Sequence, residues 1–150
     1  MLVFAHLGLT LAAASGARKL GLRPDLVFVA IGSLLPDMID KPLGQLIYGS
    51  MATGRIFAHT LLFLIVLVVI AAILHSPKVA SLAGGVLAHL VLDSIWATPV
   101  ILFWPLLGDF PVNPELSVLG YFEMLMRGLE KPDIFVPEII GFLYLAHITS

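Results

Sequence analysis

The chain has 150 residues, of which 59% are hydrophobic and only 12% are charged, whereas soluble domains carry roughly 25% charged residues. This composition predicts a single membrane-embedded domain over residues 1–150 and excludes an ordinary soluble protein. The absence of cysteine excludes disulfides and thiolate metal ligands, and a net charge of −2 without a basic stripe argues against a nucleic-acid partner.

Apolar segments predict the membrane spans in chain order. Four strong spans cover residues 2–17, 25–36, 56–75 and 79–97. The third contains the 19-residue run Ile56–Leu74, whose only ionisable residue is His59, and a run of this length can cross a hydrocarbon core of about 30 Å. A fifth span over residues 133–149 is weaker because it carries Pro137 and Glu138.

The segment 98–132 has a mixed pattern. Prolines interrupt its first half, and its second half, "ELSVLGYFEMLMRGLE", has helical periodicity. We expect a kinked re-entrant or surface piece followed by an interfacial amphipathic helix. The predicted fold class is therefore all-α, a polytopic membrane helical bundle of about five spans with an interfacial helix.

The alternating direction of the spans predicts that ligand-type side chains gather on one face of the membrane. These residues are His6, Asp37, Asp40, His59, His89 and Asp93. His89 and Asp93 are four residues apart and so share one helix face. Asp37 and Asp40 are three apart and share one face if the helix continues past Pro36, which tends to kink or break it. We therefore expect the six side chains to form one site.

Histidine and aspartate without thiols are the ligands of a divalent metal site. They suit Zn²⁺, with Mn²⁺ or Fe²⁺ as alternatives, and the site would hold one ion or two ions bridged by a carboxylate. Asp37 or Asp40 is expected to act as the catalytic base, and Arg55, four residues before His59, to hold an anionic group. For Glu138 two interpretations stay open, a site residue or a carboxylate at a helix start.

Five short blocks follow one another along almost the whole chain: "FAHLGLT", "GSLLPDMIDKPLG", "GRIFAHTLLF", "GGVLAHLVLDSIW" and "TPVILFWPLLGDFP". In this order they resemble the membrane-bound metal-dependent hydrolase family, also called YdjM-like inner-membrane hydrolases, in the form seen in archaea. The resemblance implies that the family's ligand positions fall on His6, Asp37, His59, His89 and Asp93.

Two positions depart from the family pattern. The second carboxylate, Asp40, comes one residue later than in the family's Pro-Asp-x-Asp motif, and Thr60 stands where many members have serine. The family is distantly similar to zinc-dependent phospholipase C and related nucleases, which implies phosphoester hydrolysis by analogy of fold.

The sequence thus predicts a membrane-embedded, metal-dependent hydrolase that acts through metal-activated water on a phosphoester or related ester of a lipid-like substrate. Its partners would be the lipid bilayer and that substrate. The alternative is a non-enzymatic small transporter or proton or ion relay that uses the same His/Asp cluster. Arg18, Lys19 and Arg23 follow the first span, so we expect that end to be cytoplasmic and the site to face the extracytoplasmic side of the inner or plasma membrane.

Overall fold

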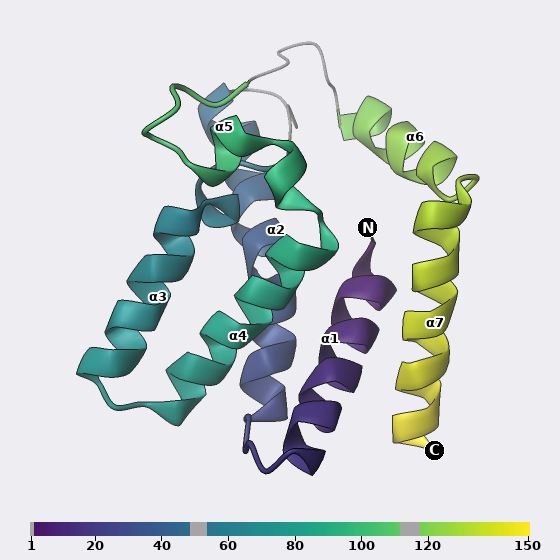
Figure 1. The fold of residues 1–150 in the computed structure, drawn as a ribbon. Coiled ribbons are helices and arrows are strands. Elements are labelled where there is room, and N and C mark those ends of the chain that lie inside the picture. Colours follow the sequence, from purple (N-terminus) through teal and green to yellow (C-terminus); the bar gives the residue numbers. More distant parts are fainter. Residues whose placement is uncertain (1, 49–53, 112–117) are drawn as a thin grey trace.

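The computed structural model describes residues 2–48, 54–111 and 118–150, and within these ranges every regular element is a helix (Figure 1). In chain order the elements are α1 (Val3–Lys19), α2 (Leu26–Tyr48), the 3-10 helix η1 (Phe57–His59), α3 (Leu61–Ile73), α4 (Pro77–Leu92), the 3-10 helix η2 (Ile95–Ala97), α5 (Pro99–Leu102), α6 (Val118–Gly128) and α7 (Pro132–Thr149). The predicted all-α class is confirmed for this part of the chain.

Capping side chains explain where α3 and α4 begin. Oγ1 of Thr60 accepts a hydrogen bond from the backbone N–H of Phe63 at 3.0 Å, so α3 starts after Thr60. Ser76 caps α4 in the same way through the N–H of Val79 at 3.3 Å. The predicted span 56–75 is therefore divided between η1 and an α3 of 13 residues.

The second predicted span is longer in the structure than residues 25–36. α2 continues through Pro36 and Pro42 to Tyr48, although proline tends to kink or end a helix. The condition that the helix continue past Pro36 is therefore met. As a result, Asp37 and Asp40 lie within a continuous helix and not in a loop after it.

The long helices lie side by side. α2 packs against α4 and α1, α7 packs against α1, and α3 packs against α4 (Figure 1). The α1–α2 turn, the α3–α4 turn and the C-terminus lie at one end of this bundle, whereas the N-terminus, α5 and α6 lie towards the other (Figure 1). We call this second end the site end, because the predicted ligands gather there.

Glycines bring α2 and α4 into backbone contact. A Cβ at Gly85 of α4 would collide with the carbonyl oxygen of Val29, and a Cβ at Gly32 of α2 would collide with that of Leu82. A Cβ at the neighbouring Gly84 would meet open space. Close approach through small residues is typical of helix pairs in membranes, and here it fixes the two helices that carry Asp37 and His89.

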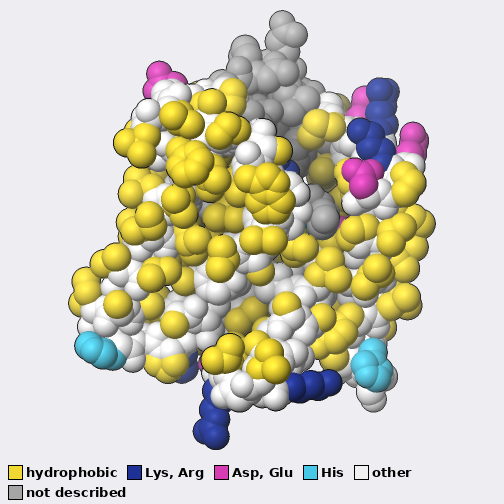
Figure 2. Space-filling model, viewed as in Figure 1, with side chains coloured by type: hydrophobic (Ala, Val, Ile, Leu, Met, Phe, Trp, Pro, Cys, Tyr) yellow, Lys and Arg dark blue, Asp and Glu magenta, His cyan; other side chains and the backbone are white. Residues whose placement is uncertain are grey.

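On the face shown in Figure 2, apolar side chains cover much of the surface, and charged side chains gather towards the two ends of the bundle. The large exposed apolar side chains of α3 alone are Leu62, Ile65, Val66, Val68, Val69, Ile70 and Ile73. The buried apolar cluster is small by comparison and is centred on Val86, Leu90, Ile95 and Ile101. Extended apolar surface of this kind marks a face that meets lipid or another protein.

The helices differ from the predicted membrane spans. Among the described residues, no helix is both long enough and apolar enough to cross a membrane. A helix is present at the position of the predicted interfacial helix, where α6 covers Val118–Gly128. The structure therefore supports the helical class, and it does not by itself support an arrangement of five membrane spans.

Candidate metal centre

The predicted ligands come from four separate elements that meet at the site end. His6 lies near the start of α1, Asp37 in α2, His59 in η1 and His89 in the last turn of α4, with Asp93 as the C-cap of α4. The three histidines are almost completely buried, with at most 1% of their surface exposed. Buried imidazoles need defined partners at both ring nitrogens.

Each imidazole ring is oriented by a contact at Nδ1. Nδ1 of His6 donates to the carbonyl of Leu2 at 2.7 Å, and Nδ1 of His89 donates to the carbonyl of Ser33 at 2.7 Å. Nδ1 of His59 faces a buried carboxylate in the same way. Because these oxygens only accept, the proton of each neutral ring lies on Nδ1 and the lone pair lies on Nε2. Proteins use this second contact to orient histidines that bind metal.

Asp40 is the carboxylate behind His59, and it is completely buried. Oδ2 accepts from Nδ1 of His59 at 2.7 Å, from the N–H of His59 at 3.2 Å and from the N–H of Ile56 at 2.8 Å. Oδ1 accepts from the N–H of Ala58 at 2.8 Å. Asp40 therefore fixes η1 and the ring of His59, and this geometry does not favour its predicted role as ligand or base.

The Nε2 atoms of His59 and His89 lie 3.1 Å apart. Since the proton of each neutral ring lies on Nδ1, these two atoms present lone pairs to each other. Lone pairs at this separation repel unless a positive charge, either a proton or a metal ion, is shared between them. The arrangement is therefore able to hold a cation.

Two carboxylates complete the cluster. Oδ1 of Asp93 lies 3.1 Å from Nε2 of His6, and Oδ2 of Asp93 lies 3.7 Å from Nε2 of His59. Oδ1 of Asp37 lies 3.8 Å from Nε2 of His59. The two carboxylates thus approach the histidines from α4 and α2.

Among the residues that the structure describes, two groups of three are geometrically able to bind a metal ion. One contains His6, His89 and Asp93, the other contains Asp37, His59 and His89, and within each group the ligand atoms lie within 4.8 Å of one another. His89 belongs to both groups, and its Nδ1 is engaged by the carbonyl of α2. Only Nε2 of His89 remains to bind a metal ion, and one nitrogen binds one ion. The two groups therefore share a ligand and belong to one centre.

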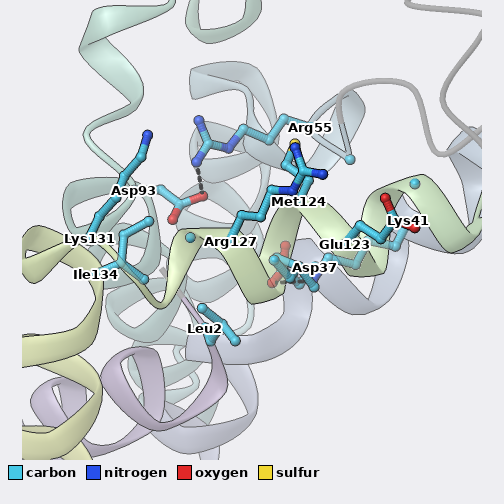
Figure 3. A pocket seen from close by; sticks show the side chains of 14 residues that line it. Leu2, Asp37, Lys41, Arg55, Asp93, Glu123, Met124, Arg127, Lys131 and Ile134 are labelled. Atoms are coloured by element: carbon cyan, nitrogen blue, oxygen red, sulfur yellow. Dashed lines mark hydrogen bonds and ion pairs between the residues drawn. The ribbon is translucent and has the colours of Figure 1, made fainter.

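The centre opens into a cavity of about 660 Å³. Asp37, Asp93, Arg55 and Lys41 line the inner wall of this cavity (Figure 3). Nη2 of Arg55 lies 2.9 Å from Oδ2 of Asp93, and Nζ of Lys41 lies 2.8 Å from Oδ2 of Asp37. Each carboxylate that faces the cavity is therefore paired with a cation.

Sequence reasoning did not assign Arg127 and Lys131 to the site. Both line the cavity from the end of α6 and the start of α7 (Figure 3). Their signal in the sequence was the pair of cations just before the predicted fifth span; in the structure they flank the turn between α6 and α7. Alone, that pattern is indistinguishable from a solvated surface.

Glu138 has a role that neither open interpretation describes, because it caps the start of α1 and not the start of its own helix. It lies in α7, is 7% exposed, and accepts hydrogen bonds from the N–H groups of Leu2 at 2.6 Å and Phe4 at 3.0 Å. It thereby caps the start of α1 and fixes the turn that carries His6. It is in neither of the three-residue groups.

The comparisons with known proteins agree with the family resemblance. The model of the family described as YdjM inner membrane protein matches residues 1–148. No curated protein and no solved structure matches the chain. The match covers every element that contributes to the centre.

Proposed function

Because the chain belongs to the YdjM inner membrane protein family, we propose that it is an integral membrane hydrolase with a divalent metal centre. Its substrate is a phosphoester or related ester of a lipid-like molecule. The observation that carries the proposal is the set of three buried histidines, each oriented at Nδ1 and each directing Nε2 into one cluster with two aspartates.

The donor set fits zinc best. Imidazole nitrogens and carboxylate oxygens without thiolates are the ligands of catalytic zinc sites, and Mn²⁺ or Fe²⁺ would accept the same set. His6, His59, His89, Asp93 and Asp37 would hold the ion or ions. When bound, such an ion supplies Lewis acidity, which polarises the ester and lowers the pKa of a water molecule.

The remaining steps belong to the side chains that line the cavity. Asp37 is the base: its side chain is 23% exposed and faces the cavity, so the carboxylate oxygen that does not hold the ion can take the proton of the attacking water. Arg55, with its side chain 32% exposed, reaches the anionic oxygens of the substrate while it holds Asp93. Asp40 acts through His59 by fixing the ring, as carboxylates commonly do behind metal-binding histidines.

The outer surface supports membrane insertion. The apolar side chains between the charged ends would face lipid (Figure 2), in a bundle of five segments that correspond to α1, α2, α3 with η1, α4 and α7, with α6 at the interface. Arg18, Lys19 and Arg23 lie at the end opposite the site, which favours a cytoplasmic location for that end and an extracytoplasmic one for the centre.

The placement of buried charge favours a hydrolase over an ion relay. Among the described residues, the buried ionisable side chains are His6, Asp40, His59, His89 and Glu138, and all of them belong to the centre or to its immediate supports. A relay needs ionisable groups along the whole path through the membrane. Here they are concentrated at the site end.

Metal analysis of purified protein tests the proposal. The wild type and a His147→Gln variant, altered at an exposed position near the end of α7, should retain metal and hydrolyse a phosphoester substrate. His89→Gln should lose both, because His89 belongs to both three-residue groups. Equal metal content in wild type and His89→Gln would contradict the centre. Metal retention without hydrolysis, together with ion flux in vesicles, would favour the relay.

A further inference from the structure

The cavity has a second wall that the proposed chemistry does not use. This wall is formed by α6 and the start of α7, opposite the inner wall that carries the aspartates (Figure 3). It contributes Glu123, Arg127 and Lys131 as charged groups, together with apolar side chains. A wall of this composition is a candidate for recognition of the substrate.

The two cations of this wall, Arg127 and Lys131, have no carboxylate partner among the residues that the structure describes. Glu123, one helical turn before Arg127, makes no ion pair in this part of the chain either. On the inner wall, by contrast, Arg55 and Lys41 are paired with aspartates. A divalent ion at the centre would offset these aspartates and leave the cavity with a clear excess of positive charge.

The same cavity has an apolar part. Leu2, Met124, Leu125 and Ile134 line it beside the cations. Cations next to apolar side chains fit a ligand in which a charged group is joined to a hydrocarbon chain. Arg127 can grip a phosphate through two parallel N–H donors, and Lys131 adds a point charge.

We propose that Arg127 and Lys131 form the binding site for the phosphate of a phosphomonoester carried on an alkyl chain, and so determine the substrate class. This inference rests on the proposed function, since it assigns a substrate to the same centre. A monoester phosphate has a second pKa near 6 and carries two negative charges above neutral pH, which matches the excess of cations. A choline diester carries one negative charge and a quaternary ammonium that these side chains would repel.

The test is binding of dodecyl phosphate at pH 8 to purified, metal-loaded protein in an uncharged maltoside detergent, measured by calorimetric titration. Arg127→Gln and Lys131→Gln should each weaken binding by about ten- to a hundred-fold, as expected for loss of one charge-assisted contact. Glu123→Gln should tighten binding, because it removes a negative charge from the same wall. Lys19→Gln, which removes a cation at the opposite end of the bundle, is the matched control and should bind as the wild type does.

Three outcomes would overturn the inference. The first is equal affinity in Arg127→Gln, Lys131→Gln and the wild type. The second is dodecylphosphocholine that binds as tightly as dodecyl phosphate. The third is inorganic phosphate that binds equally well, which would make the ligand a free anion and not an amphiphile.

Metal content measured in every variant separates this inference from the proposed function. Arg127→Gln should keep its metal, so its weaker binding cannot come from loss of the centre. If the wild type held no metal yet bound dodecyl phosphate through Arg127, the proposed hydrolase would fail and the phosphate site would stand.

Discussion

Replacing Asp40 with asparagine tests whether this buried carboxylate positions His59. The wild-type side chain accepts four hydrogen bonds, one from the ring of His59 and three from backbone N–H groups. Asparagine keeps one accepting oxygen and replaces the other with an NH₂ group that only donates. The best orientation keeps the oxygen towards His59 and Ile56, and the N–H of Ala58 then faces another donor.

The magnitude follows from two unsatisfied donors, the N–H of Ala58 and the new NH₂ group that faces it. A buried donor without an acceptor costs about 1–3 kcal/mol, so Asp40→Asn should lower the free energy of unfolding by at least about that amount and still fold. A neutral amide also makes the ring of His59 a weaker base than a carboxylate does. Loss of such a supporting contact typically lowers metal affinity by about 10- to 100-fold.

Two measurements separate these effects. Thermal or denaturant unfolding of the chelated protein reports the structural cost without metal, and a competition titration reports metal affinity. Asp37→Asn is the matched control, because Asp37 is partly exposed and its pair with Lys41 lies at the surface of the cavity. It should cost less than about 1 kcal/mol of stability while lowering activity.

The reasoning would be refuted by an Asp40→Asn protein with wild-type stability and wild-type metal affinity. It would also be refuted if Asp37→Asn were the more destabilised of the two, since the argument depends on the complete burial of Asp40. Activity alone would not distinguish the two aspartates.

Three further predictions concern the helices around the centre. Gly85→Ala should lower stability by about 1–3 kcal/mol through overpacking against α2, whereas Gly84→Ala should be neutral or stabilising by up to about 1 kcal/mol, as unfolding curves will show. Glu138→Gln should weaken the cap of α1 by about 1 kcal/mol with unchanged metal content; loss of metal would make Glu138 a ligand. A cysteine at Glu130 should react with an impermeant thiol reagent in intact cells, and one at Ser150 only after permeabilisation; the opposite result inverts the orientation.

The sequence by itself predicted the helical class and which histidine and aspartate side chains gather at one end of the bundle. Apolar runs bounded by glycine, proline and charge locate helices, because each helix must satisfy its backbone internally and bury or insert its apolar side chains. The spacing of His89 and Asp93, and the alternation of the segments, then predict which side chains share one end. Apolar runs, residue spacing and the alternation of segments are all properties of the sequence itself, so they can be recognised without a structure.

Only the tertiary structure decided how each of these residues is used. Asp37 and Asp40 are three residues apart in one helix, yet the first faces the cavity and the second is closed off by four donors from a segment some 20 residues later. Likewise, Glu138 caps a helix at the other end of the chain. A side chain's role depends on which donors the fold brings to it, and no spacing within one segment contains that information.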